Sequence, residues 1–111
     1  MDLTTLERLP LWIGGRAVAA HTTRYGEVTN PATGEVVRHV PLADAFDVDA
    51  AVDAARTAFP AWRAAPALRR ARILMRFRDL RDKHKKDLAR IVTEEHGKTL
   101  TDAEGSITRG I

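Results

Sequence analysis

Cysteine is absent from this sequence of 111 residues, aromatic side chains are few, and no long apolar run occurs. Without cysteine the chain can form no disulfide, no thiolate nucleophile and no thiolate metal site. No stretch approaches the ~20 apolar residues that a membrane helix needs. The opening MDLTTLERLP carries mixed charge instead of the apolar segment of a signal peptide. We therefore expect a cytoplasmic protein with no membrane partner, and at most one small domain.

Positive charge is concentrated in one part of the chain. Ten of the eighteen Lys and Arg residues lie between Pro66 and Arg90. Such a block could bind a nucleic-acid backbone electrostatically. Its cations, however, fall all round the predicted helix, and Phe77 is the only aromatic side chain among them, too few for base stacking. We interpret the block as a solvated face or a subunit contact and expect no specific nucleic-acid binding. A small basic helical module that binds nucleic acid or a partner protein is the alternative.

Two β-hairpins are predicted between residues 11 and 41. In LWIGGRAVAA, two short apolar runs flank Gly14 and Gly15, and paired glycines fit the left-handed positions of a tight hairpin turn. In GEVTNPATGEVVRHVPLA, Pro31 fixes φ at the first corner of a turn, and Gly34 can take the positive φ that closes it. β-branched residues in rough alternation flank this second turn and predict its two strands.

The hydrophobic period changes to that of a helix from Asp44 onward. Apolar residues at helical spacing predict a helix over about 44–62. Asp44 or Asp47 is available as its N-cap, and Pro60 is expected to end its regular part.

Two further helices are predicted. An apolar stripe predicts a helix over about 66–96 with a break near His84, and Gly97 is the expected left-handed residue after it. The segment 101–104 (TDAE) matches a capping box, in which a hydroxyl and a carboxylate each bond an orphan backbone N–H. It predicts a helix over about 101–111. One face of that helix carries Ala103, Ile107 and Ile111.

No stop signal ends the third helix, and two hairpins followed by helices leave no central sheet to pack against. The apolar stripe of the second helix can be covered only in part by this chain. We therefore expect the 111 residues, with α+β structure of their own, to be a piece of a larger protein.

No group of residues in this chain predicts catalysis by itself. The segment HGKT at 96–99 resembles the end of a phosphate-binding loop, but Val92 replaces the first glycine of that motif and the segment follows a helix. Ser106, the only serine, has no His or carboxylate placed by spacing to activate it. We predict no catalytic and no cofactor-binding residue in the chain. The histidines, too scattered for a metal-ligand pair, are His21, His39, His84 and His96.

Several stretches together resemble the start of an aldehyde dehydrogenase. They are the early IGG, NPATGEVVRHVPLA, DVDAAVDAARTAFPAW, LRRARILMRFRDL and EEHGKTLTDAEG. NPATGE and HGK are general to that superfamily. The TRGI ending is more specific and resembles the matching segment of the CoA-acylating branch. Enzymes of this branch convert methylmalonate and malonate semialdehydes to propanoyl-CoA or acetyl-CoA with release of CO₂. The resemblance covers nearly everything from Leu11 to Ile111.

The resemblance implies an α/β fold much longer than this chain, with a Rossmann-like cofactor domain, a catalytic domain and an oligomerisation flap in a homo-oligomer. Residues 1–111 would supply hairpins and helices that wrap the cofactor domain. NAD would be the hydride acceptor and CoA the co-substrate. The cysteine nucleophile, the general base, the oxyanion-hole asparagine and the NAD-contacting residues would all lie beyond position 111. The superfamily also implies a monovalent cation on backbone carbonyls near Val28, Thr29 and Glu95.

Arg109 is the one substrate-binding residue that the resemblance implies. Substrates of this branch carry a carboxylate, which a planar guanidinium meets with two parallel hydrogen bonds. In this branch such an arginine stands on the helix after the HGK segment, and Arg109 in TRGI matches its position. Arg109 also lies off the apolar stripe, between Gly105 and Gly110, where small neighbours would leave room for a ligand. The alternatives are a surface arginine and, for the parent enzyme, a general NAD(P)-dependent aldehyde dehydrogenase.

Overall fold

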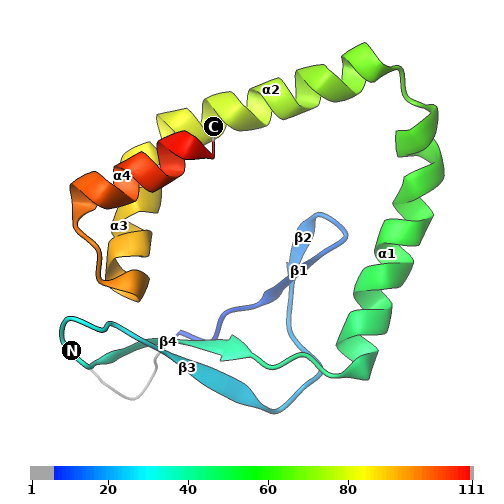
Figure 1. Ribbon diagram of the computed structural model, residues 1–111. Helices are drawn as coiled ribbons and strands as arrows, with labels where there is room; N and C mark the ends of the chain where they lie inside the picture. Colours follow the sequence, from blue (N-terminus) through cyan, green and yellow to red (C-terminus); the bar gives the residue numbers. More distant parts are fainter. Residues whose placement is uncertain (1–6, 111) are drawn as a thin grey trace. The chain divides into compact units, whose positions relative to one another are not determined.

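The computed structural model describes residues 7–110 of the chain (Figure 1). In this range it contains four α-helices and two two-stranded antiparallel sheets, so the α+β prediction for these residues is confirmed. The chain divides into two compact units. Of the described residues, the first unit contains 7–29 together with Val36–Ala64, and the second contains Asn30–Glu35 together with 65–110.

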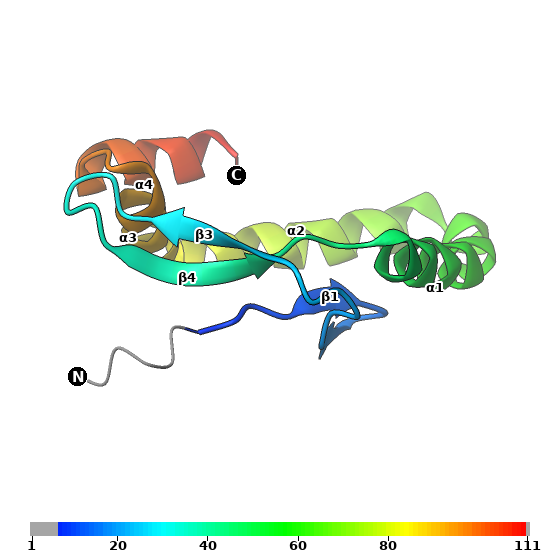
Figure 2. The same cartoon turned by 90° about the horizontal axis from the view of Figure 1, so that it is seen from below.

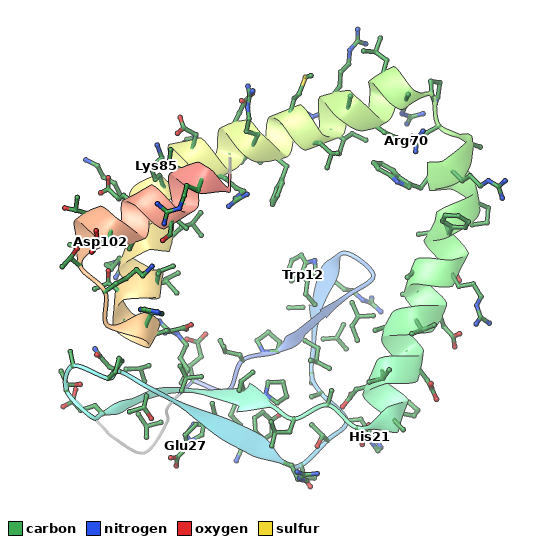
Figure 3. All side chains as sticks on the ribbon, viewed as in Figure 1. Trp12, His21, Glu27, Arg70, Lys85 and Asp102 are labelled. Atoms are coloured by element: carbon green, nitrogen blue, oxygen red, sulfur yellow. The ribbon has the colours of Figure 1, made fainter. Side chains whose placement is uncertain are left out.

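The first hairpin pairs β1 (Leu11–Ile13) with β2 (Arg16–Val18). Gly14 and Gly15 connect the strands with φ values of 63° and 79°. Both values are positive, as a two-residue turn that follows the strand twist requires, and the predicted glycine turn is confirmed. Trp12 projects from β1 and is 73% exposed (Figure 3).

The second hairpin pairs β3 (Tyr25–Thr29) with β4 (Val36–Pro41), which run side by side in Figure 2. Its turn is held by Asn30, whose backbone carbonyl accepts the Gly34 N–H at 2.8 Å and whose side-chain Oδ1 accepts the Ala32 N–H at 3.0 Å. Gly34 has a φ of 77°, so the positive φ predicted for it is confirmed. The pairing register shifts between Val28 and Thr29, where Val37 is the extra residue of a bulge in β4.

Helix α1 (Ala45–Ala64) begins with a reciprocal cap. Asp44 Oδ1 accepts the backbone N–H of Asp47 at 3.0 Å, and Asp47 Oδ2 accepts that of Asp44 at 3.2 Å. Both predicted N-cap candidates therefore take part in capping the helix, each accepting the backbone N–H of the other. The prediction that Pro60 ends the regular part of this helix was wrong, because α1 continues through it to Ala64. Proline removes one N–H from the ladder, and water can satisfy the freed carbonyl because this part of α1 is exposed.

The second unit contains α2 (Ala67–Lys83), α3 (Lys85–His96) and α4 (Leu100–Arg109). The predicted break is confirmed, since His84 separates α2 from α3 with φ −101° and ψ 17°. Gly97 ends α3 with a φ of 85°, as predicted for a left-handed C-terminal residue. The predicted end of the last helix at Ile111 lies outside the described residues.

Little apolar surface is buried in residues 7–110. Ala89 and Ala103 have no exposed surface, Pro41 is also buried, and α2 has no buried residue. Leu74 and Phe77, which the sequence analysis placed on the second helix stripe, are 60% and 58% exposed. An apolar stripe this exposed is typical of a surface that packs against another element.

Candidate functional site

The candidate site is built on α4 and the four residues before it. The prediction that Thr101 caps this helix was wrong. Thr99 is the N-cap, and its hydroxyl accepts the backbone N–H of Asp102 at 3.2 Å, so α4 begins at Leu100 (Figure 3 labels Asp102). Thr99 and Thr101 each precede an acidic residue by three positions, so both match the capping-box pattern. In the structure the helix is capped by Thr99.

Helix α4 lies against α3 in both ribbon views (Figures 1 and 2). Ala89 on α3 and Ala103 on α4 have no exposed surface, which allows the two backbones to approach closely. Ile107 continues the predicted face of α4 and is half-buried, whereas Arg109 is exposed on another side of the helix. Arg109 therefore lies off the apolar stripe, as the sequence indicated.

The turn between α3 and α4 is fixed by Gly97. A Cβ atom at this position would lie 2.7 Å from Cγ of Pro31 and would clash with it. The NPATGE turn thus packs directly on the HGK segment, so the two motifs that are general to the superfamily contact each other.

Lys98 and Arg109 converge on the hydroxyl of Ser106. Lys98 Nζ donates to Ser106 Oγ at 3.0 Å, and Arg109 Nη2 donates to the same oxygen at 3.0 Å. Ser106 and Lys98 are half-buried, and Arg109 is exposed. Within residues 7–110 neither cation forms an ion pair. This cationic cluster, defined as Lys98, Ser106 and Arg109, is the most distinctive polar arrangement of the second unit.

The space beside Arg109 differs from the sequence expectation. Gly105 and Gly110 were expected to leave room for a ligand. The space over Gly105 is filled by Arg109 itself, because a Cβ there would lie 3.6 Å from Nη1 of Arg109. The space over Gly110 is filled by Arg81, whose guanidinium donates to the Gly110 carbonyl. A ligand must therefore approach the open side of the Arg109 guanidinium.

Val28, Thr29 and Glu95, the residues implied for a monovalent cation, belong to different units. Val28 and Thr29 pair with Arg38 and Val36 of β4, on either side of the register shift. Glu95 lies in the last turn of α3. Backbone carbonyls are suitable ligands for a hard cation. The cation site stays a prediction.

The histidines do not form a metal site. Within the described range no three His, Asp or Glu side chains come together as possible ligands. His21 Nδ1 lies 2.7 Å from Oδ2 of Asp44, beside the start of α1 (Figure 3). This hydrogen bond, with the nearby charge of Asp44, raises the pKa of His21 above its ordinary value and lowers the pKa of Asp44. The pair is a helix-cap contact.

Part of the basic block is neutralised by nearby carboxylates of α2. Arg78 pairs with Asp79 at 2.9 Å, and Lys85 pairs with Asp82 at 2.9 Å. The Arg81 guanidinium donates a hydrogen bond to the Gly110 carbonyl. Among the residues that the structure describes, no helix is long and apolar enough to cross a membrane.

Comparison with known proteins gives the family. The profile named "Aldehyde dehydrogenase family" matches residues 18–111. The chain belongs to the aldehyde dehydrogenase family. A malonate-semialdehyde dehydrogenase of Pseudomonas aeruginosa is 48% identical over 99 residues, which are 89% of this chain and 20% of that protein. The predicted family resemblance is confirmed.

Solved aldehyde dehydrogenases share the fold of the chain. A Sinorhizobium meliloti protein assigned as methylmalonate-semialdehyde dehydrogenase and solved with NAD aligns at a TM-score of 0.92 and 42% identity, over 96% of this chain and 22% of that one. A succinate-semialdehyde dehydrogenase of Burkholderia pseudomallei aligns at a TM-score of 0.85 and 41% identity, over 97% and 22%. The 111 residues thus match the N-terminal part of the aldehyde dehydrogenase fold and span about a fifth of the length of these relatives.

Sequence reasoning missed two members of the cationic cluster. Lys98 was considered only as part of a phosphate loop, and Ser106 only as a nucleophile. One signal was present, because Ser106 and Arg109 are three residues apart on a helix and so lie on one side of it. The approach of Lys98 depends on the turn at Gly97 and on the packing of α4 against α3, which no local pattern specifies.

Proposed function

We propose that the complete enzyme carrying these residues is an NAD-dependent, CoA-acylating dehydrogenase of malonate or methylmalonate semialdehyde. The observation that carries the proposal is the 48% identity to a malonate-semialdehyde dehydrogenase over 89% of the chain. The 42% identity to the S. meliloti protein solved with NAD supports NAD as the cofactor.

Arg109 binds the carboxylate of the substrate in this proposal. Malonate and methylmalonate semialdehydes carry a second acidic group that simple aldehydes lack, and a fixed guanidinium can hold it with two charge-assisted hydrogen bonds. Arg109 is exposed and forms no ion pair within residues 7–110, so its charge is available to a ligand. Its role is to bind and orient the aldehyde.

NAD supplies the hydride acceptor when it is bound, and CoA collects the acyl group. The groups that perform these steps are not among the 111 residues, which contain no cysteine. We therefore expect the isolated chain to have no dehydrogenase activity and no measurable affinity for NAD in isothermal titration.

The test uses a complete enzyme, made from a full reading frame or as a chimera in which these residues replace the matching segment of the P. aeruginosa relative. Arg109→Leu should lower kcat/KM for methylmalonate semialdehyde through a raised KM and should spare propanal. Loss of one charged hydrogen-bonding partner costs about 2–4 kcal/mol, or roughly 30- to 1000-fold. An equal loss with both substrates would make Arg109 a structural residue.

Succinate semialdehyde is the second candidate substrate. It is favoured by the 41% identity to the B. pseudomallei succinate-semialdehyde dehydrogenase. Both candidates require a bound carboxylate, but they differ by one carbon in chain length. Comparing kcat/KM for the two semialdehydes, each with and without CoA, separates them, since only the CoA-acylating enzyme yields a thioester.

A further inference from the structure

Ser106 accepts hydrogen bonds from two positively charged side chains. Its Oγ accepts one hydrogen bond from the Lys98 ammonium and one from the Arg109 guanidinium, each at 3.0 Å. The two nitrogens lie within about twice that distance of each other. Lys98 reaches Ser106 from the turn before α4, whereas Arg109 reaches it from the end of α4.

The hydrogen-bond capacity of these groups leaves several donors unused. A serine hydroxyl has two acceptor lone pairs and one proton. Both lone pairs of Ser106 are occupied, so its proton is directed away from Lys98 and Arg109 toward a further acceptor. Within residues 7–110 no acceptor for that proton is found. An ammonium has three N–H groups and a guanidinium has five, so both cations also keep donors for a ligand.

The charges around Ser106 also favour a bound anion. Two like charges at this separation repel each other, and the repulsion grows where water is partly excluded. Lys98 and Ser106 are half-buried, and no carboxylate from residues 7–110 compensates either cation. An oxyanion between the cations would remove the repulsion and accept from all three side chains.

We propose that Lys98, Ser106 and Arg109 bind the carboxylate of the aldehyde substrate together, with Lys98 and the Ser106 hydroxyl as binding residues beside Arg109. The inference rests on the proposed function and deepens it. A carboxylate has two oxygens and about four lone-pair sites, enough for the fork of Arg109, one ammonium N–H and one hydroxyl. Ser106 also fixes the spacing of the two cations when the substrate is absent.

The experiment measures steady-state kinetics of the complete enzyme with methylmalonate semialdehyde and with propanal, together with inhibition by malonate. Lys98→Met should raise KM for the semialdehyde and the Ki of malonate about tenfold or more, and leave propanal within twofold. Ser106→Ala should raise both constants about three- to tenfold, and Ser106→Thr, which keeps a hydroxyl, should restore them. Lys83→Met on α2 removes an exposed lysine and is the matched control.

The outcomes separate this inference from the proposed function. If Arg109→Leu abolishes the preference for the semialdehyde while Lys98→Met and Ser106→Ala leave it unchanged, the inference is wrong and the proposed function stands. If the unaltered enzyme shows no preference for carboxylate-bearing aldehydes and no inhibition by malonate, both are wrong. If Lys98→Met raises KM for NAD or CoA instead, the cluster binds a cofactor phosphate and the carboxylate assignment is overturned. If Lys98→Met fails to fold, the KM and Ki values of Ser106→Ala, which is a smaller change, test the inference instead.

Discussion

Asp47 accepts the backbone N–H of His21, 26 positions earlier in the chain, at 2.7 Å. The same carboxylate accepts the N–H groups of Thr22 and Asp44, each at 3.2 Å. Asp47 is 5% exposed, so one nearly buried side chain satisfies all three donors, and its bond to Thr22 is itself buried. The carboxylate therefore joins the segment after the first hairpin to the start of α1, where the helix dipole also favours negative charge.

Asp47→Ala should destabilise the first unit by about 2–3 kcal/mol, because buried backbone donors would lose their acceptor. The measurement is the free energy of unfolding of the complete enzyme, or its thermal midpoint where unfolding is irreversible. Asp49→Ala is the matched control, since Asp49 is exposed in the same turn and should change stability by less than about 0.5 kcal/mol. Equal effects of the two substitutions would contradict the role given to Asp47.

The His21–Asp44 pair should stabilise the cap in a limited pH range. The pKa of His21 is raised from 6.5, mainly by its hydrogen bond to Asp44, so its contribution is complete below 6.5 and is lost as pH rises through the folded-state pKa. The pKa of Asp44 is lowered from 3.8, mainly by the same bond, so its contribution is complete above 3.8 and is lost as pH falls through the folded-state pKa.

The difference in thermal midpoint between the unaltered protein and His21→Gln should therefore be largest between pH 3.8 and 6.5. It should also shrink with added salt, because both side chains are well exposed. A difference that is independent of pH would show that the pair does not act through charge.

Gly97→Ala should destabilise the turn between α3 and α4 more than Gly34→Ala destabilises its own turn. Both glycines have positive φ, 85° and 77°, so each substitution has a backbone cost of about 1–2 kcal/mol. Only at Gly97 does the new methyl group also meet Pro31, at 2.7 Å, while nothing lies within 4 Å at Gly34. Thermal unfolding should therefore rank Gly97→Ala as the more damaging change.

Pro31→Ala in the Gly97→Ala background tests the steric part of this cost. Alanine removes the Cγ atom that meets the new methyl group, so the double variant should recover the part of the loss that exceeds that of Gly34→Ala. Strictly additive effects would show that the contact contributes nothing.

The basic block should bind nucleic acid weakly and without sequence preference. Arg78 and Lys85 have carboxylate partners, and any remaining attraction rests on release of counterions. Fluorescence anisotropy with a labelled duplex should show affinity that falls steeply between 50 and 200 mM salt, a range over which such contacts lose much of their strength. A sequence-selective complex that survives at the higher salt concentration would favour a nucleic-acid function.

The parts of the fold that the sequence predicted correctly depend on local backbone chemistry. Gly14, Gly15, Gly34 and Gly97 adopt the positive φ values expected of them, and the interrupted apolar stripe places the break at His84. Pro60 was misjudged because a proline weakens an exposed helix without always ending it.

The candidate site was predicted only at Arg109, through family resemblance. Its relation to Lys98 and Ser106 depends on packing across the α3–α4 turn. The acceptor role of Asp47 was missed for the same reason, since its partners His21 and Thr22 lie on a distant segment. Contacts of this kind are set by tertiary structure, which overrides local preference.

The exposed apolar faces of α1 and α2 have a consequence during synthesis on the ribosome. In an enzyme of this family, the segment that these residues match is translated first, and about four-fifths of the polypeptide follows it. At about 5–20 residues per second, roughly 400 further residues take about 20–80 s. Phe59, Phe77 and Leu80, each more than half exposed, remain without their final neighbours for that time. Apolar surface that stays exposed for this long favours aggregation of the nascent chain.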